Sequence, residues 1–238
     1  KYAMDRLSGA QRLEANGECA LGKSTLQVMI VDDHPLVREG LVALIRATTG
    51  LQVCAEAGNA EEALSAIANE VPDLVVLDLV LPGKDGIELI KDIRVQYPRV
   101  RVLVLSMHEE ALYVERALRA GANGYIMKCE PGAKVIDAIR SVQRGELVVS
   151  SAIASHMLRP SVSNKSGTDT RTSIERLSDR ELQVFSDIGR GKSTQEIAHS
   201  LNLSFKTIQT YREHIKRKLG LRNATDLVHC AMHWVGTE

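Results

Sequence analysis

The chain has 238 residues, enough for two domains or one large one, and its 44% apolar and 25% charged content is ordinary for a globular protein. The 30 basic and 30 acidic residues give a net charge of zero, so the overall charge does not favour binding to nucleic acid. Any basic surface must be local. There is no apolar run near the roughly 18 residues of a membrane span, and no secretory signal pattern. The four cysteines are scattered without metal-binding spacing. We therefore expect a cytoplasmic protein from a reducing compartment.

Residues 1–25 are polar and lack a steady period, so we expect a tail that is either disordered or not native to the protein. The tail contains Gly17-Glu18-Cys19-Ala20-Leu21-Gly22-Lys23-Ser24, which matches the phosphate-loop pattern G-x-x-x-x-G-K-[ST]. That loop binds phosphate only between a buried strand and the start of a helix. Here no apolar strand precedes the motif and a strand-like run follows it, so we do not expect a nucleotide site.

From Leu26 onward, apolar strand-like runs alternate with helical stretches. Strands are expected at Leu26–Val31, Leu51–Ala57, Asp73–Asp78, Val100–Leu105 and Asn123–Met127. Helices are expected near Leu36–Ala47, Ala60–Asn69, Ile87–Gln96, Glu110–Ala120 and Pro131–Val142. This alternation is typical of βαβ units with right-handed crossovers. It predicts an α/β domain at residues 26–144 with a doubly wound, five-stranded parallel sheet of the flavodoxin-like kind.

Residues 145–173 lose this rhythm. A short helix is possible at Ser150–Leu158, and the Ser/Thr/Gly-rich residues 161–170 predict a linker.

A second periodic region, residues 174–238, predicts an all-α domain of four helices. They are expected at Ser178–Gly189, Gln195–Leu201, Phe205–Leu219 and Ala224–Trp234. Ser178 and Glu181 form a capping-box pattern, and Gly220 ends the third helix. A short helix, a tight turn and a longer helix are the geometry of a helix-turn-helix.

Polar residues stand at the ends of four predicted strands: Asp32 and Asp33, then Asp78, Ser106 and Lys128. The carboxyl ends of parallel strands share one edge, where open α/β sheets bind ligands, so we expect these side chains to converge. Three close carboxylates repel unless a cation neutralises them, and such oxygen ligands suit Mg²⁺. A carboxylate beside a metal ion and a lysine can attack a phosphoryl group. Each residue alone is equally explained as a helix cap or turn former.

These motifs resemble a two-component response regulator of the NarL/FixJ type over about residues 27–236. The resemblance is carried by Val31-Asp32-Asp33-His34-Pro35, Leu77-Asp78-Leu79-Val80-Leu81-Pro82-Gly83, Ser106, Gly121-Ala122-Asn123-Gly124-Tyr125-Ile126-Met127-Lys128 and the C-terminal helices. It implies that residues 26–144 are a receiver domain whose Asp78 accepts a phosphoryl group from a histidine kinase.

The resemblance also implies roles around Asp78. Asp33 and Asp78 would bind Mg²⁺ with the backbone carbonyl of Val80, and Asp32 would act through a metal-bound water. Ser106 and Lys128 would contact the phosphoryl oxygens, and Tyr125 would swing inward as an aromatic switch. From its place in a strand, Tyr125 is equally explained as a half-buried aromatic residue.

Two neighbouring positions bear on the lifetime of such a phosphoryl group. Val80, two residues after Asp78, has no polar group to orient an attacking water, whereas His108, two residues after Ser106, has one. We expect slow self-dephosphorylation and no turnover as an enzyme.

The C-terminal helices resemble the LuxR-type helix-turn-helix through Leu177–Glu181, Gln195–Ala198, Ser204–Tyr211 and Lys218–Leu221. Tyr211 stands where family members often carry His. From Phe205 to Arg222 there are six basic residues and one acid, Glu213, a local charge of +5. Such a helix can be just a solvated face, but after a helix-turn pair it predicts binding to DNA phosphates.

Periodicity divides the recognition helix into two faces. Ile208, Ile215 and Leu219 are expected to be buried. The expected DNA contacts are Lys206, Thr207, Gln209, Thr210, Arg212, Glu213, Lys216, Arg217 and Arg222. Gln209, Thr210 and Glu213 suit base edges, whereas Lys216, Arg217 and Arg222 suit phosphates.

One helix-turn-helix domain makes few contacts, so we expect a homodimer on two half-sites of double-stranded promoter DNA. The last helix carries Leu227, Val228, Ala231 and Trp234 at helical spacing. This row is either the dimer face or the side that packs on its own domain.

The sequence thus predicts a phosphorylation-switched transcription regulator, in which phosphoryl on Asp78 shifts an existing equilibrium. An aspartyl-phosphate hydrolase would need a second acid where Val80 stands. A regulator with a phosphorylation-independent receiver is a further alternative, which the complete acid set disfavours. The phosphate-loop ATPase is the weakest reading.

Overall fold

The computed structural model describes residues 25–107, 111–150, 154 and 173–237. The phosphate-loop pattern at residues 17–24, His108 and most of the helix predicted at Ser150–Leu158 lie outside the described residues. None of the helices formed by the described residues combines the length and the apolar character that crossing a membrane requires.

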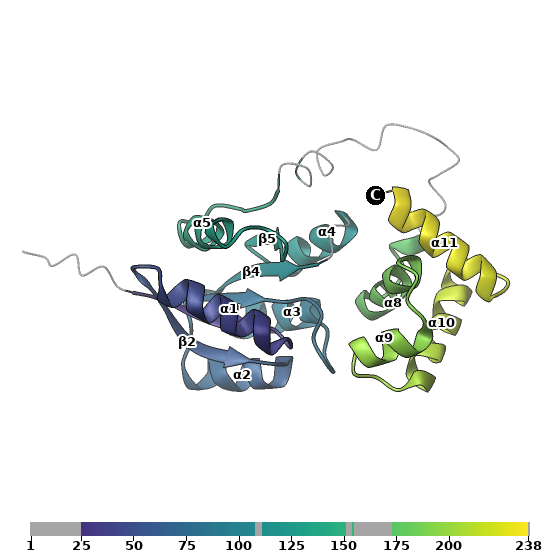
Figure 1. Cartoon of the computed structure of the whole chain (residues 1–238), viewed down its shortest axis with the longest axis horizontal. Coiled ribbons are helices and arrows are strands. Elements are labelled where there is room, and N and C mark those ends of the chain that lie inside the picture. The colour runs from purple at the N-terminus through teal and green to yellow at the C-terminus, as the bar shows by residue number, and fades with distance from the viewer. Residues whose placement is uncertain (1–24, 108–110, 151–153, 155–172, 238) are drawn as a thin grey trace, which may run out of the picture.

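The first part of the chain is the predicted α/β fold (Figure 1). Its strands are β1 (Leu26–Val31), β2 (Leu51–Ala57), β3 (Leu74–Leu77), β4 (Arg101–Ser106) and β5 (Gly124–Met127). Its helices are α1 (Pro35–Arg46), α2 (Ala60–Asn69), α3 (Gly86–Gln96), α4 (Ala111–Ala120) and α5 (Gly132–Gln143). These elements agree closely with those predicted from hydrophobic period, because buried strands and amphipathic helices leave different patterns in the sequence.

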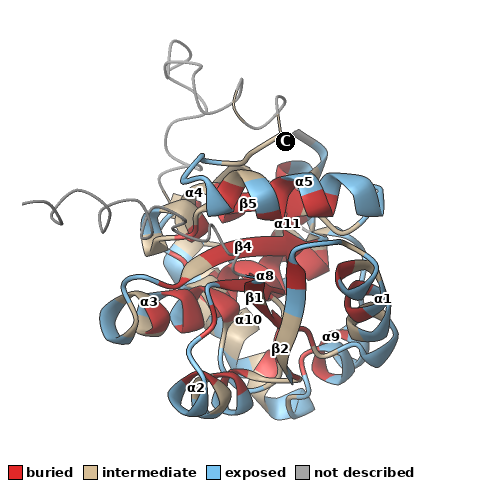
Figure 2. Ribbon diagram, turned by 90° about the vertical axis from the view of Figure 1, so that its left-hand side faces the viewer, coloured by how far each residue is buried: buried red, intermediate tan, exposed pale blue. Residues whose placement is uncertain are grey.

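All strand pairs are parallel, in the order β2-β1-β3-β4-β5, which confirms the predicted doubly wound sheet. Alternate residues of each strand enter different cores. Val28 and Ile30 of β1 pack with α1 and α5, whereas Met29 and Val31 pack with α2, α3 and α4. Strands β1, β3, β4 and β5 are therefore buried on both faces, as parallel sheets require, whereas the edge strand β2 is largely exposed or partly buried (Figure 2). In this strand order, β1 and β3 form the switch point, beside which such sheets place their ligand sites.

The second part of the chain is the predicted four-helix unit: α8 (Asp179–Gly189), α9 (Thr194–Ser200), α10 (Phe205–Leu219) and α11 (Ala224–Thr237). Ser178 and Glu181 form the predicted capping box at the start of α8, and Ser204 caps α10. Gly220 ends α10 with a left-handed φ of 66°. Local capping chemistry thus sets the helix boundaries.

Helix α11 packs against α8 within its own unit. The rings of Phe185 and Trp234 lie 5.6 Å apart, and Leu227 and Ala231 are fully buried. Of the two explanations for the apolar row on α11, packing on its own domain is therefore correct for Leu227, Ala231 and Trp234. Met232 remains exposed on another side of the helix.

The division at residues 26–144, 145–173 and 174–238 remains a prediction. Val148, beyond the predicted end of the first domain, forms a parallel bridge with Gly124 of β5.

Gly86, the first residue of α3, sets the close approach of this helix to the loop after β3. A Cβ atom at Gly86 would lie 2.6 Å from Leu79 Cα and 2.8 Å from the carbonyl oxygens of Asp78 and Leu79. These are backbone atoms, so the loop itself must move to accept a side chain. We predict that Gly86→Ala lowers the free energy of unfolding by about 1–3 kcal/mol, the usual range for overpacking.

The matched control is Gly40→Ala in α1, where an added Cβ meets nothing within 4 Å. There, alanine should stabilise the helix by about 0.5–1 kcal/mol. Urea denaturation followed by circular dichroism measures both changes, and equal effects of the two substitutions would contradict the packing argument.

Candidate functional site

The carboxyl edge of the sheet brings together the polar residues predicted from the strand ends. Val31 pairs with Leu77, so Asp32 and Asp78 follow neighbouring strands. Asp32, Asp78 and Ser106 are all buried. The Lys128 ammonium lies 2.6 Å from Asp32 Oδ2 and 2.7 Å from Asp78 Oδ2. This lysine therefore joins the two carboxylates across the switch point.

Burial controls the protonation of this cluster. Desolvation raises the pKa of Asp78 to about 6, the Lys128 ammonium opposes this shift, and Asp32 adds to it. Burial of Lys128 would lower its pKa, but Asp78 and Asp32 outweigh it and raise the pKa above its ordinary value. The lysine therefore stays charged between the acids.

Asp33 and His34 complete a group that could hold a metal ion. One ligand atom each from Asp32, Asp33, His34 and Asp78 lies within 4.8 Å of the others. Asp33 Oδ1 is buried and accepts no hydrogen bond of acceptable geometry from the described residues, although His34 Nδ1 is 2.7 Å away. A buried carboxylate oxygen left in this way fits a cation ligand, and the oxygen-rich set fits Mg²⁺. We did not predict His34 as a site residue; its place directly after two acids was the only sequence signal.

The loop from Leu79 to Asp85 connects Asp78 to α3. The Val80 amide donates to Asp78 Oδ1 at 3.1 Å, and the Gly86 amide donates to the Leu79 carbonyl at 3.0 Å. At the end of the loop, Asp85 caps α3 by accepting from the Ile87 amide. The conformation of this loop is therefore tied directly to the Asp78 carboxylate.

Tyr125 in β5 is fully buried and belongs to the core that packs against α2, α3 and α4. The alternative of a half-buried aromatic residue is therefore wrong, because both faces of the sheet are covered at this strand. Its predicted role as a switch remains a proposal.

The predicted DNA-contacting residues differ in exposure. Lys206, Thr210, Glu213, Arg217 and Arg222 are exposed, while Thr207, Gln209, Arg212 and Lys216 are partly buried. Ile208 and Ile215 are fully buried, and Leu219 is partly buried. One face of α10 thus presents polar side chains at helical spacing.

Ion pairs reduce the free charge of α10. Lys216 pairs with Glu213 at 2.8 Å, and Lys218 pairs with Glu181 of α8 at 2.5 Å. Lys218 therefore helps to hold α10 against α8, so the local charge of +5 overstates the charge that is free to meet DNA. Desolvation lowers the pKa of the half-buried Arg212 guanidinium.

Comparison with known proteins gives two family matches. Residues 28–140 match the response regulator receiver domain, and residues 175–231 match the bacterial regulatory proteins of the luxR family. The transcriptional activator protein ExaE of Pseudomonas putida is 36% identical over 206 residues, which are 86% of this chain and 95% of ExaE.

Solved structures agree with these matches. A two-component response regulator of the LuxR family from Aurantimonas sp. SI85-9A1 is 41% identical, covers 56% of this chain and 94% of its own, and has a TM-score of 0.53. RcsB of Salmonella enterica serovar Typhimurium, bound to a promoter in the presence of phosphomimetic BeF3-, is 25% identical over 88% of this chain and 99% of its own, with a TM-score of 0.58. Another RcsB structure, 25% identical over 87% of this chain and 98% of its own, has a TM-score of 0.53 and contains two dimers bound to two parallel DNAs.

A parallel sheet with an acidic carboxyl edge, joined to a helix-turn-helix unit, defines a DNA-binding regulator. The chain belongs to the response regulators that combine a receiver domain with a LuxR-type DNA-binding domain.

The raised pKa of Asp78 has a consequence for stability. Because its folded-state pKa of about 6 exceeds the ordinary value of 3.8, Asp78 lowers stability progressively as the pH rises from about 4 to about 6, and the full cost remains above pH 6. Asp78→Asn removes that cost. We predict that it raises the free energy of unfolding at pH 8 by up to about 3 kcal/mol, at about 1.36 kcal/mol per pKa unit.

The gain should shrink as the pH falls from 6 toward 4, where the wild-type carboxyl is protonated in the folded state. Denaturation in the presence of EDTA at several pH values measures it. Asp73→Asn is the matched control, because Asp73 is exposed at the opposite end of the same strand. A gain for Asp78→Asn that does not change with pH would contradict the assignment.

Proposed function

We propose that Asp78 accepts a phosphoryl group from a histidine kinase and that this modification controls DNA binding by the LuxR-type domain. The observation that carries the proposal is the buried Asp78 carboxylate, bonded to Lys128 and adjacent to Asp32 at the switch point of the sheet. A carboxylate in this setting can attack phosphorus, because charge that develops on the phosphoryl oxygens meets the lysine ammonium.

Mg²⁺ fits this site. When bound, it would neutralise negative charge on the carboxylates and on the phosphoryl oxygens. Asp32, Asp33 and Asp78 would hold it, with the backbone carbonyl of Val80 as a further ligand and Asp32 acting through water. Lys128 would bind one phosphoryl oxygen, and the Ser106 hydroxyl would donate to another. Tyr125 would act as the aromatic switch.

Helix α10 would enter the major groove of promoter DNA. Gln209, Thr210 and Glu213 would face base edges, and the surrounding cations would hold phosphates. A homodimer on two half-sites would supply the contacts that one domain lacks. Because the inner row of α11 is buried in its own domain, a dimer face on α11 would use its exposed side, which includes Met232.

Phosphorylation can be tested without the kinase. Wild-type protein incubated with acetyl phosphate and Mg²⁺ should gain the mass of one phosphoryl group, measured by intact mass spectrometry. Asp78→Ala should gain none, whereas Asp73→Asn should behave like wild type. A folded wild-type protein that gains no mass would leave a DNA-binding protein with a phosphorylation-independent receiver.

The same preparation, followed after removal of acetyl phosphate, gives the lifetime of the modification. Val80 offers no polar group to orient water, so we expect slow loss, with the mass gain still present well beyond a few seconds. Loss within seconds would exclude slow self-dephosphorylation and favour a hydrolase.

The proposed DNA interface predicts two kinds of substitution effect on DNA affinity. The affinity is measured on a DNA site that the whole chain has selected in vitro from random sequences. Arg217→Ala should weaken binding to all sequences and reduce the slope of log affinity against log salt by about 1. Thr210→Ala should change base preference at one position by about 1–3 kcal/mol. Arg119→Ala is the control, since this arginine is 78% exposed on α4 of the receiver. Identical effects of all three would contradict the proposed interface.

A further inference from the structure

Two histidines stand about one turn apart on α11. Of the seven histidines in the chain, His229 and His233 are the one pair at i,i+4 spacing. Both residues are exposed. Side chains at this spacing are neighbours on a helix surface, with Cβ atoms about 5–6 Å apart. Two histidines placed in this way on one helix face can bind the same zinc ion, so the pair is a candidate metal site in the DNA-binding domain.

The pair lies on the side of α11 that points away from its own domain. A rotation of about 100° per residue places His229 and His233 nearly opposite the apolar row that packs on α8. The exposed side chain of Met232 lies on the same side as the pair. In Figure 1, α11 is beyond α8 as seen from the sheet. The two imidazoles are therefore not needed for the core of the four-helix unit.

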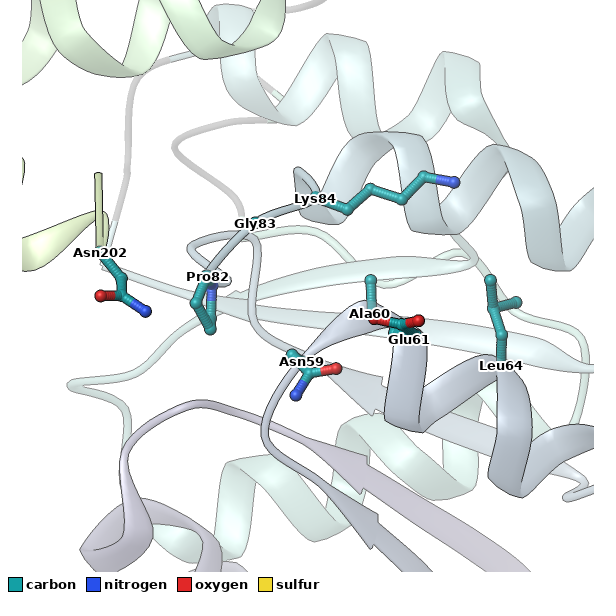
Figure 3. A pocket seen from close by; sticks show the side chains of 8 residues that line it. All are labelled: Asn59, Ala60, Glu61, Leu64, Pro82, Gly83, Lys84 and Asn202. Carbon is teal, nitrogen blue, oxygen red and sulfur yellow. The ribbon is translucent and has the colours of Figure 1, made fainter. Parts of the chain in front are cut away.

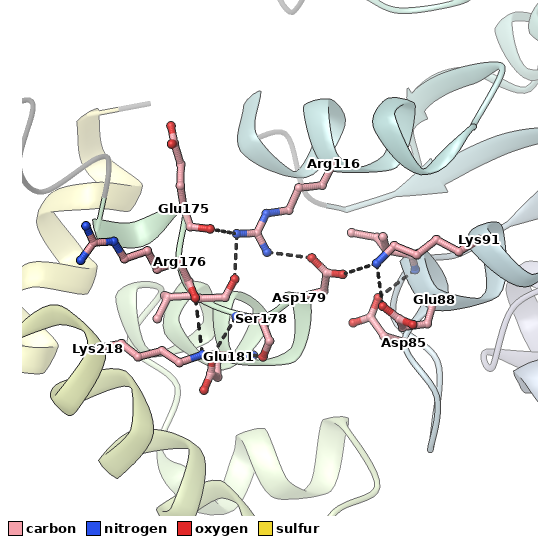
Figure 4. Close-up of polar contacts among 12 residues, drawn as sticks. Asp85, Glu88, Lys91, Arg116, Glu175, Arg176, Ser178, Asp179, Glu181 and Lys218 are labelled. Carbon is pink, nitrogen blue, oxygen red and sulfur yellow. Dashed lines mark hydrogen bonds and ion pairs between the residues drawn. The ribbon is translucent and has the colours of Figure 1, made fainter.

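Pockets at the junction of the two domains do not include this side of α11. One pocket, of about 530 Å³, is lined in part by Pro82 of the receiver and Asn202 of the DNA-binding domain (Figure 3). Another, of about 500 Å³, surrounds the contact between Arg116 and Asp179 (Figure 4). The histidine pair and the contact between the domains are thus separate features of the surface.

The composition of α11 favours binding of a divalent cation. The helix contains no lysine or arginine, and Asp226 is its single charged residue. Burial raises the pKa of the Cys230 thiol, next to His229, so this thiol stays protonated at neutral pH and does not compete as a ligand. Nitrogen ligands favour Zn²⁺ over Mg²⁺. The pair therefore differs in kind from the oxygen-rich group at the carboxyl edge of the sheet.

One chain supplies half of a closed zinc site. Structural Zn²⁺ takes four protein ligands in a tetrahedral arrangement, and the pair provides two. In a dimer with two-fold symmetry, the same surface patch of both copies forms the interface. A second copy of this chain can therefore supply the two missing nitrogens. The outer side of α11 is also the side that remains for a dimer face, because the inner row is buried in its own domain.

We propose that His229 and His233 of two copies of this chain bind one Zn²⁺ ion, which joins the two α11 helices. The inference goes beyond the proposed function, and its bridging step rests on the homodimer of that function. Metal binding would add to the free energy of dimerisation, because the complete set of four ligands exists only in the dimer.

The first test measures zinc binding to the whole chain by isothermal titration calorimetry in excess Mg²⁺. Wild type should bind one ion per two chains at this site. His229→Ala and His233→Ala should each weaken that binding by at least about tenfold, the loss usual even for residues that only orient a ligand. His199→Ala is the matched control, because His199 is exposed on α9 and has no histidine four residues away. Zinc bound elsewhere on the chain stays in all variants and cancels in the comparison.

The second test measures dimerisation by analytical ultracentrifugation without DNA or a phosphoryl donor. Zn²⁺ should raise the dimer fraction of wild type and of His199→Ala, and EDTA should reverse the change. The same addition should leave His229→Ala and His233→Ala as they are without zinc. Co²⁺ in place of Zn²⁺ should give the visible absorption of a tetrahedral nitrogen site in wild type, and both α11 variants should lose it.

Three results would overturn the proposal: equal zinc affinity in all four proteins, one ion per chain without dimerisation, or zinc-dependent dimers of His229→Ala. Circular dichroism of each variant excludes misfolding as the cause of a difference. The mass gain with acetyl phosphate does not involve α11, so it should be the same in all four proteins. Its absence from wild type would therefore reject the phosphorylation of Asp78 and leave the zinc result standing on its own.

Discussion

The salt bridge that Lys128 makes to Asp32 and Asp78 is the interaction on which the candidate site depends. Two buried carboxylates on neighbouring strands repel, and the free energy of that repulsion would oppose closure of the β1–β3 switch point. The ammonium of Lys128, the residue after β5, offsets this repulsion at distances of 2.6 and 2.7 Å from the two carboxylates. Desolvation by burial, to which the charge of Asp32 adds, still outweighs the ammonium and raises the pKa of Asp78 to about 6. The site therefore keeps two buried carboxylates close together, in a cluster that could hold a metal ion.

The loop after Asp78 connects this site to the DNA-binding domain by hydrogen bonds. The Val80 amide of the loop donates to Asp78, and the Leu81 and Gly83 carbonyls accept from Arg180 of α8. Gly86 packs so closely on the backbone of Asp78 and Leu79 that it leaves no room for a side chain. The junction includes the side chains of Lys91, Arg116 and Arg180. Such a junction can change with small movements of one loop, which is what a switch between two arrangements requires.

Much of the site could be predicted because its residues occupy strand ends. A parallel sheet of five alternating units has one possible carboxyl edge, so the positions of Asp32, Asp78, Ser106 and Lys128 follow from the sequence once the strands are recognised. His34 was missed, because a histidine in a loop has no pattern that distinguishes a surface side chain from one beside a carboxylate. Lys218 was counted with the free cations of α10, because the sequence of one helix does not indicate that its last turn meets Glu181 of another.

The sequence by itself determined the fold class, most helix and strand boundaries to within one residue, and the convergence of the acids and the lysine. These features depend on hydrophobic period, capping residues and strand order, which are local or nearly local. Only the tertiary structure decided that Tyr125 is fully buried, that the apolar row of α11 packs on α8, and that the polar residues of α8 from Arg180 to Asp187 are buried. The contact of Arg180 with Leu81 and Gly83 joins residues nearly 100 positions apart. Such contacts depend on how the surfaces of two folded domains pack against each other, and no local sequence pattern encodes that packing.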